Sequence, residues 1–354
     1  MYTKLEIKNF RGLKELTIDL KPITLVSGKN NTGKSSILES LFLFQDYANP
    51  QVFSKLLSFR GAEAYERLPQ TVWEPLFHNA CTDEPIVIRL NDDYTLALEM
   101  KSGYFSADDA LSMINGINTI YTGDVVLSCS FKKGDYSFHG NYLLNMGVGS
   151  YDFFISSSSP PQPNSDYIQY LGPHVKQSDL MLSEWYGKIE ISKDKTRKNK
   201  LIDILSIMDE NITDVTTIAS RGTVQLYFID REGYALPIHA VGDGTRNVMQ
   251  IILALLANPG CILLIDEVEN GIHYSLHSAL WKVISTLANQ LECQIVATTH
   301  SFDCICGALD GIKEAGLENE FTYARLDKSV SAITPKLYSS DALERAINTD
   351  WEVR

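Results

Sequence analysis

Apolar and polar residues alternate in two runs at the start of the chain, on either side of Arg11-Gly12. Apolar side chains stand at Tyr2, Leu5, Ile7 and Phe10, and again at Leu13, Leu16, Ile18 and Leu20. Alternation in two neighbouring runs predicts a β-hairpin or a bent strand pair. The next run, Ile23–Val26, predicts a strand buried on both faces, and apolar positions at helical spacing follow from Ser35 to Phe44.

The rest of the chain divides by pattern into a strand-rich middle, a helical stretch and a second alternation of helices and strands. Strands are predicted at Ile86–Ile88, Thr95–Met100, Val125–Phe131 and Tyr151–Ile155, with a loop at Ser156–Pro163. Helices are expected within Gln177–Glu210, followed by a hairpin with arms at Val215–Ile218 and Thr223–Ile229 around Ser220-Arg221-Gly222. Later strands are expected at Ile262–Ile265, Gln294–Ala297 and Thr322–Arg325, and helices after Gly244 and at Cys304–Leu309 and Asp341–Ile347.

Three segments are expected from this pattern. Residues 1–175 would form the N-terminal half of the core together with a β-rich subdomain. Residues 176–214 would be a helical insert, and residues 215–354 would complete the core.

Length and composition fit a protein that buries a large core. The chain has 354 residues, of which 44% are hydrophobic and 21% charged, as is ordinary for a soluble globular protein. Its formal net charge of -13 argues against a surface coated in DNA-binding charge. The one basic cluster, between Lys188 and Lys200, also contains Glu190 and Asp194. This mixture is typical of a solvated helix or loop face, with a nucleic-acid contact as the alternative.

No pattern indicates a disulfide framework, a zinc site or a membrane span. The six cysteines are scattered, and Cys304-Ile305-Cys306 has the wrong spacing for zinc or a redox pair. The apolar runs Ile251–Ala257 and Cys261–Ile265 are too short to cross a bilayer. The opening residues alternate as a strand, so we expect no targeting signal, no membrane partner and a cytoplasmic protein with reduced thiols.

The segment from Gly28 to Ser35, Gly-Lys-Asn-Asn-Thr-Gly-Lys-Ser, fits the phosphate-binding loop at every fixed position. It lies between a predicted strand and a predicted helix, which is the context that such a loop requires. Its glycines let backbone N–H groups approach phosphates, and the helix N-terminus adds favourable partial charge. Lys34 is expected to reach the β- and γ-phosphates and to act in catalysis, while Ser35 is expected to ligate Mg²⁺.

Two carboxylates, Asp266 and Glu267, end the apolar strand Ile262–Ile265. An aspartate in this position can hold the Mg²⁺ shell, and a glutamate beside it can polarise an attacking water. His300 ends the next apolar strand and is expected to lie at the same sheet edge, close enough to sense the γ-phosphate. His273 and His277, four residues apart, lack the further ligands that a metal site needs, so packing is the simpler interpretation.

Four segments together resemble the ABC class of ATPases. Val241-Gly242-Asp243-Gly244-Thr245-Arg246 resembles its signature loop, and together with Gly28–Ser35, Ile262–Glu267 and Thr298–Ser301 it is similar to the SMC/RecF/OLD branch. The opening Ile7–Leu13 is similar to the first strand of that branch. Within that branch, Tyr170–Pro173 and Leu264–His273 are most similar to compact OLD-like bacterial ABC ATPases. The resemblance implies an α/β fold, an ABC-type P-loop NTPase head with a mixed central sheet, an antiparallel β subdomain and a helical insert.

The resemblance also implies a head-to-tail homodimer or higher oligomer with composite sites for ATP and Mg²⁺. ATP on the phosphate loop of one subunit would meet the signature loop of the other, whose helix N-terminus points at the γ-phosphate. Asn270 resembles a residue of the D-loop that crosses the interface, and Arg11 matches an arginine near the nucleotide. The nucleotide-binding residues expected in this way are Gly28, Asn30, Asn31, Thr32, Gly33, Lys34, Ser35, Ser36, Arg11, Gly242, Asp243, Gly244, Thr245 and Asn270.

Two features depart from the ABC pattern. Gly242 stands where the signature loop usually has a serine, so that backbone N–H groups must replace a hydroxyl contact to the γ-phosphate. The glutamine of the Q-loop has no identified counterpart. Gln45 is a candidate only because it follows the phosphate-loop helix.

The function that this resemblance implies is an ATP-dependent dimerisation switch that controls a separate effector, a nuclease or a toxin, in bacterial anti-phage defence or a toxin–antitoxin system. We expect no TOPRIM nuclease domain, because the stretch after His300 is short and has no Asp-x-Asp pair. The alternative is a RecF/SMC-like repair or recombination ATPase with DNA as its partner. A transporter subunit fits the SMC-like opening strands poorly, and a non-hydrolysing scaffold fits the intact Glu267 poorly.

Overall fold

The computed structural model describes residues 1–61, 72–102, 125–147, 150–157, 168–175, 177–220, 223–329, 332–349 and 352–353. Most of the predicted proline-rich loop, residues 158–163, lies outside these ranges. The predicted turn residues Arg221 and Gly222 also lie outside them.

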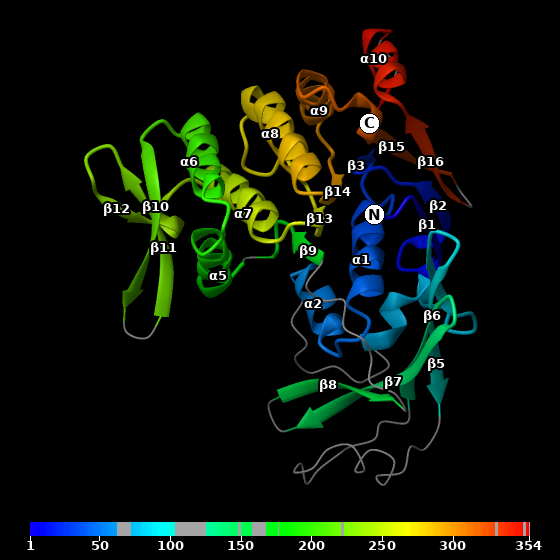
Figure 1. The fold of residues 1–354 in the computed structure, drawn as a ribbon. Coiled ribbons are helices and arrows are strands. Elements are labelled where there is room, and N and C mark those ends of the chain that lie inside the picture. Colours follow the sequence, from blue (N-terminus) through cyan, green and yellow to red (C-terminus); the bar gives the residue numbers. More distant parts are fainter. Residues whose placement is uncertain are drawn as a thin grey trace.

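A six-stranded sheet forms the centre of the molecule, in the order β16-β15-β3-β14-β13-β9 (Figure 1). Neighbouring strands run parallel except β16, which pairs antiparallel with β15. The predicted mixed central sheet is therefore confirmed. Its strands are β3 (Ile23–Gly28), β9 (Ile168–Leu171), β13 (Ile262–Ile265), β14 (Gln294–Thr298), β15 (Phe321–Lys328) and β16 (Ile333–Tyr338).

Helices cover both faces of this sheet because alternate side chains of its strands point to opposite sides. On β13, Leu264 packs into the core that contains helix α1, whereas Leu263 and Ile265 pack into the core that contains α7, α8 and α9. The helices are α1 (Lys34–Gln45), α2 (Val52–Ser58), α5 (Asp179–Glu190), α6 (Thr196–Met208), α7 (Asp243–Ala257), α8 (His277–Gln290), α9 (Phe302–Glu314) and α10 (Ser340–Asn348).

A seven-stranded antiparallel sheet lies on the α1 side of the molecule, in the order β2-β1-β4-β5-β6-β7-β8. It joins the predicted N-terminal hairpin to the predicted β-rich middle, so the two form one sheet. Strand β7 is longer than any other strand here and was not predicted. The strands are β1 (Lys4–Phe10), β2 (Leu13–Asp19), β4 (Ile86–Leu90), β5 (Tyr94–Ser102), β6 (Val125–Lys133), β7 (Tyr136–Gly147) and β8 (Ser150–Ser157).

A third, three-stranded sheet stands apart from the other two at the left of Figure 1, beside α5 and α6. It consists of β10 (Ile212–Ser220), β11 (Thr223–Asp230) and β12 (Ala235–Pro237), paired antiparallel in that order. Helix α7 packs against α5 and α6 and links this part to the central sheet. The predicted hairpin and helical insert are thus present, while domain boundaries at 175 and 214 stay a prediction.

His273 and His277 do not share a helix face, because His273 lies before α8, which begins at His277. The ring of His273 instead packs near that of Tyr274, with the ring centroids 4.4 Å apart. In the described part of the chain, every helix is too short or too polar to cross a membrane.

Candidate active site

The phosphate loop joins β3 to α1 and needs glycine at two positions for separate steric reasons. Gly28 and Gly33 have φ angles of 145° and 86°, which side chains with a Cβ rarely adopt. A Cβ on Gly28 would lie 2.7 Å from the carbonyl oxygen of Leu326, and one on Gly33 would lie 2.5 Å from Cδ2 of Leu13. The loop is therefore shaped by strand β15 on one side and by the β1–β2 hairpin on the other.

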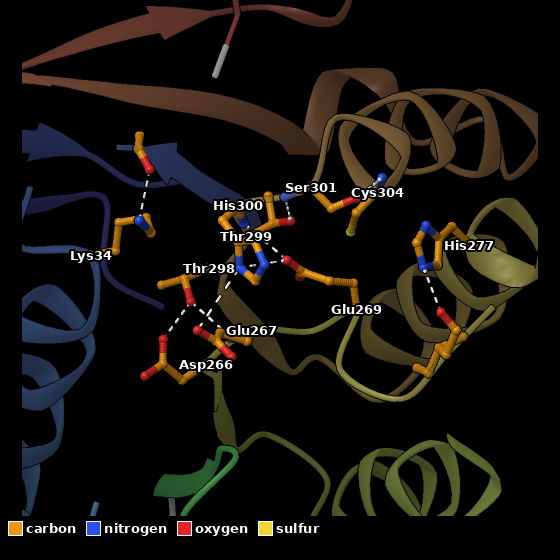
Figure 2. A network of polar contacts seen from close by, with 12 residues as sticks. Lys34, Asp266, Glu267, Glu269, His277, Thr298, Thr299, His300, Ser301 and Cys304 are labelled. Atoms are coloured by element: carbon orange, nitrogen blue, oxygen red, sulfur yellow. Dashed lines mark hydrogen bonds and ion pairs between the residues drawn. The ribbon is translucent and has the colours of Figure 1, made fainter. Parts of the chain in front are cut away.

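The side chain of Lys34 lies along this loop (Figure 2). Its ammonium donates hydrogen bonds to the carbonyl oxygens of Gly28, at 2.7 Å, and Lys29, at 3.1 Å. Burial lowers the pKa of Lys34, while the nearby carboxylates of Asp266, Glu267 and Glu269 oppose that shift. A partly desolvated cation at the start of a helix is well placed to bind phosphate oxygens.

Both carboxylate oxygens of Asp266 accept hydrogen bonds from neighbouring strands. The hydroxyl of Thr298 donates to Oδ1 at 2.5 Å, and the phenol of Tyr170 donates to Oδ2 at 3.1 Å. Burial raises the pKa of Tyr170, so its O–H stays a donor at neutral pH. This arrangement follows from the parallel register, which sets Ile265 of β13 beside Leu171 of β9 and Ala297 of β14.

Glu267 has a left-handed backbone conformation, with φ of 54°. Its N–H donates to the hydroxyl of Thr298 at 2.9 Å, which helps hold this turn, and its side chain is 45% exposed. A non-glycine residue in this conformation costs about 1–3 kcal/mol and is often found at functional sites. The strand thus ends in one fixed carboxylate, Asp266, and one solvent-accessible carboxylate, Glu267.

His300 lies beside both glutamates at the end of β14 (Figure 2). Its Nδ1 is 3.1 Å from Oε1 of Glu269 and 3.9 Å from Oε1 of Glu267. Its backbone N–H also donates to Oε1 of Glu269 at 2.9 Å. The structure therefore brings His300 to the carboxylate edge, as expected, with Glu269 as its direct partner.

The signature loop leads into α7, whose N-cap residue is Gly242. A Cβ on Gly244 would lie 2.2 Å from the carbonyl oxygen of Gly271, so the start of α7 packs directly against the predicted D-loop. The side-chain amide of Asn247 donates to the carbonyl oxygen of Asn270 at 2.8 Å. A cleft of about 240 Å³ separates α7 from the end of β13 and is lined by residues that include Asp243, Arg246, Gln250, Asp266 and Glu267.

Arg11, the candidate nucleotide-binding arginine, and Gln45, the candidate Q-loop glutamine, both contact other residues of the chain. Nε of Arg11 is 2.8 Å from Oε2 of the buried Glu39, and Nε of Arg60 is 2.7 Å from Oε1 of the same glutamate. The role of Arg11 at the nucleotide stays a prediction. Gln45 lies at the far end of α1, where its amide donates to the phenol of Tyr2 at 2.6 Å, so it does not take the place of the missing Q-loop glutamine.

The remaining loop residues differ in exposure. Asn30 and Asn31 are exposed, whereas Thr32 and Ser36 are buried, and Thr32 donates to the carbonyl oxygen of Lys29 at 2.8 Å. Ser35 is partly exposed in the first turn of α1. Asp243 and Thr245 lie in the first turn of α7, and Asp243 lines the cleft described above.

The oxygen groups present fit a magnesium ion that is shared with phosphates. Mg²⁺ usually binds one or two carboxylates and keeps several waters or substrate oxygens. Asp266 offers such a carboxylate and Ser35 a hydroxyl, whereas the described residues contain no group of three or more His, Cys, Asp or Glu that could hold a metal alone. The donor set suits a metal that arrives with the nucleotide.

Three residues at this site were missed in the sequence: Tyr170, Glu269 and Thr298. Tyr170 and Thr298 act through strands that are distant in the chain, and only the sheet register brings them to Asp266. Glu269 carried a weak signal, because it follows Glu267 by two residues in the same acidic segment.

Comparisons with known proteins agree with this geometry. Residues 1–109 match the family model described as "AAA ATPase domain", and residues 143–303 match "AAA domain, putative AbiEii toxin, Type IV TA system". A Helicobacter pylori protein named ATP/GTP phosphatase is 25% identical over 97% of this chain and 97% of its own. An uncharacterized protein of Methanocaldococcus jannaschii is 33% identical over 48% of this chain and 72% of that protein.

Two solved structures share the fold. An SMC head bound to the C-winged helix domain of ScpA covers 98% of this chain and 99% of its own, with 14% identity and a TM-score of 0.54. An SMC head from Pyrococcus furiosus with an extended coiled coil, bound to the C-terminal domain of ScpA, covers 99% of both chains, with 11% identity and a TM-score of 0.52.

Fold and site together define a P-loop ATPase. The chain belongs to the same family as the Methanocaldococcus jannaschii protein, matches AAA ATPase domains over residues 1–109 and 143–303, and shares the fold of SMC heads.

Proposed function

We propose that the chain hydrolyses Mg²⁺-bound ATP as a dimer, with each site built from the phosphate loop of one subunit and the signature loop of another. The position of α7 carries this proposal. A Cβ on Gly244 would meet Gly271 and Ile272 of its own chain, whereas a Cβ on Gly242 would meet nothing within 4 Å. The free N–H groups at this helix start could therefore receive a phosphate presented by a second subunit.

The residues of one such site divide the work as follows. Lys34 and the loop backbone bind the phosphates, and Ser35 and Asp266 would hold Mg²⁺, which would offset negative charge on the phosphates. Glu267 accepts a proton from the attacking water, and its exposed carboxylate is accessible to that water. His300, oriented by Glu269, donates to the γ-phosphate.

Mixing two inactive variants tests the shared site. Lys34→Ala removes the phosphate-loop cation, and Gly244→Ala displaces the signature helix. A heterodimer of the two would contain one intact phosphate loop facing one intact signature loop. We expect the mixture to recover a substantial fraction of wild-type ATPase activity, and Glu267→Gln to form a dimer in ATP by light scattering. No recovery, together with a monomeric mass of Glu267→Gln in ATP, would contradict the proposal.

We further propose that the ATPase controls a separate effector, a nuclease or a toxin, in a compact OLD-like defence or toxin–antitoxin system. The match of residues 143–303 to a family described by the AbiEii toxin supports this assignment. Co-expression with the product of the neighbouring gene tests it. We expect growth inhibition or DNA cleavage by that product to depend on Lys34 and Glu267. An effect that is identical with Lys34→Ala would refute control by the ATPase.

DNA is less well supported as a partner, because most side chains of the basic cluster between Lys188 and Lys200 form hydrogen bonds or ion pairs within the chain. Lys188 donates to Asn258, Lys195 to the carbonyl of Glu190, and Lys200 to Gln290. Lys198 pairs with Glu190 and Asp214, and Arg197 donates to the carbonyl of Leu256. With most of these cations already paired, this face offers little free charge to a phosphate backbone.

A further inference from the structure

The phenol that donates to Asp266 belongs to an aromatic stack that reaches helix α2. We propose that Tyr170 and Phe59 together position Asp266 for Mg²⁺, so that the C-terminal end of α2 sets the affinity of the site for the metal. This inference rests on the proposed metal role of Asp266. It assigns a function to two residues that touch neither nucleotide nor metal.

The contact between the two rings is close and parallel. Their centroids are 3.8 Å apart and their planes differ by 5°. The ring of Phe42, from α1, forms T-shaped contacts with those of Phe59 and Tyr170, with centroid separations of 4.8 Å and 6.3 Å. Tyr170, Phe59 and Phe42 are only 4%, 8% and 5% exposed. The ring of Tyr170 is therefore held by two aromatic neighbours in the position from which its hydroxyl donates to Asp266.

The hydrogen bonds leave Asp266 a restricted orientation. Thr298 donates to Oδ1 and Tyr170 to Oδ2, so the carboxylate can rotate only if one of them is lost. A carboxylate has about four lone-pair sites, so each oxygen retains one for a metal. Fixing a ligand through its hydrogen-bond partners typically changes metal affinity by about 10- to 100-fold.

The end of α2 is itself anchored to both sides of the site. Phe59 is the C-cap residue of α2, and the adjacent Arg60 pairs with Glu39 of α1 at 2.7 Å. A Cβ on Gly61 would lie 3.5 Å from Nδ1 of His174, in the loop that follows β9. A shift of α2 would therefore move the stack against Tyr170 and change the distance from the phenol to Asp266.

Gly172 explains why the phenol can approach Asp266. A Cβ at this position would lie 3.0 Å from Cε1 of Tyr170 and 3.3 Å from Cβ of Asp266. Glycine thus leaves room between the two side chains where β9 ends.

Metal binding, measured apart from turnover, tests this assignment. Mn²⁺ serves as the probe, and its binding to the ATP-loaded protein is followed by electron paramagnetic resonance. Binding of a ribose-labelled fluorescent ATP analogue in EDTA reports the phosphate loop without metal. We expect Tyr170→Phe to weaken Mn²⁺ binding about tenfold, as is typical when a metal ligand loses its hydrogen-bond partner, with metal-free nucleotide affinity unchanged within about twofold. Phe59→Leu, which keeps the phenol, should weaken Mn²⁺ binding by a smaller factor.

Tyr186→Phe is the matched control, since the phenol of Tyr186 is also buried and lies within hydrogen-bond distance of the carbonyl of Val215 and of Glu190. Tyr186→Phe should change the melting temperature by about as much as Tyr170→Phe does, and it should leave the affinity for Mn²⁺ unchanged. Equal Mn²⁺ affinity in wild type, Tyr170→Phe and Phe59→Leu would overturn the positioning role. Failure of the wild type itself to bind Mn²⁺ with ATP would instead overturn the proposed metal site.

Discussion

Glu269 holds His300 at two points, since its Oε1 accepts the backbone N–H of His300 at 2.9 Å and lies 3.1 Å from the ring Nδ1. The side chain of Glu269 is only 9% exposed, whereas that of His300 is 56% exposed. A buried carboxylate that orients an accessible imidazole fixes which ring nitrogen faces the site. The histidine can then present Nε2 to the nucleotide.

Replacing Glu269 by glutamine tests this relationship. The amide can still accept the backbone N–H but loses the charge that orients the ring. Hydrogen bonds to charged groups contribute about 1.5–3 kcal/mol, so we expect the turnover rate to fall about 10- to 100-fold. ATP affinity should change by less than about threefold, because Glu269 does not contact the phosphate loop. Steady-state ATPase assays and nucleotide titration measure the two effects.

Glu314→Gln is the control for this substitution, because Glu314 pairs with Lys282 on the surface. It should leave turnover unchanged. If Glu269→Gln hydrolyses ATP at the wild-type rate, His300 is held well enough without the charge and the orienting role is wrong.

Thr298 contacts both acidic residues at the end of β13 through one hydroxyl. It donates to Asp266 at 2.5 Å and accepts the N–H of Glu267 at 2.9 Å. Thr298→Val keeps the shape but leaves a backbone donor without its partner, which costs about 1–3 kcal/mol. We expect a melting temperature lower by several degrees and a marked loss of turnover. Thr298→Ser should restore most of both, and a Val variant that is as stable and as active as the wild type would show that the hydroxyl does not support this site.

The contact between Gly244 and Gly271 predicts the effect of a single added methyl group. Alanine at position 244 would place its Cβ 2.2 Å from the carbonyl oxygen of Gly271, so the signature helix or the D-loop must move. We expect turnover to fall more than about tenfold, since displacement of a reacting group by about 1 Å can cost 100-fold in rate. ATP binding by the phosphate loop of the same chain should persist.

Gly187→Ala provides the comparison, because Gly187 also lies in a helix and a Cβ there meets nothing within 4 Å. Alanine at that position should be neutral or slightly stabilising, as its higher helix propensity implies. Full ATPase activity of Gly244→Ala would show that turnover does not require the close contact between Gly244 and Gly271.

The phosphate loop and the acidic strand were predictable because each is a continuous segment with its own local signature. Gly28–Ser35 carries its strand, turn and helix start within a few residues, and Asp266-Glu267 directly follows an apolar run. Their partners were not predictable in this way. Tyr170 and Thr298 reach Asp266 from two strands that flank β13 in the sheet, and sheet register is a non-local property.

Three of the strands missed in the sequence have identifiable causes. β16 contains Pro335, which lowers strand propensity but is tolerated on an edge strand, and β16 is the edge of the central sheet. β9 has only four residues, too few for a pattern of its own. β7 includes Gly140, Asn141 and Asn145, residues that are depleted in strands, and its neighbours β6 and β8 supply the pairing that stabilises it.

The lowered pKa of Lys34 predicts that ATP binding takes up protons at alkaline pH. The ammonium must be charged to bind phosphates, and in the free protein its pKa lies below the usual lysine value because of burial. Bound phosphates favour the charged form and raise this pKa. Between the two values the free lysine is partly neutral and the bound lysine is protonated, so affinity falls as pH rises through this window.

Calorimetric titration with ATP in two buffers of different ionisation enthalpy measures this uptake. ATP itself carries no titrating phosphate proton above about pH 8, because second phosphate pKa values lie near 6. We therefore expect net proton uptake on binding that grows as pH rises above about 8, where ATP no longer titrates, towards the ordinary lysine pKa, accompanied by weaker affinity, as proton linkage requires. Uptake that stays at zero across this range, with constant affinity, would show that Lys34 keeps its charge in the free protein despite its burial.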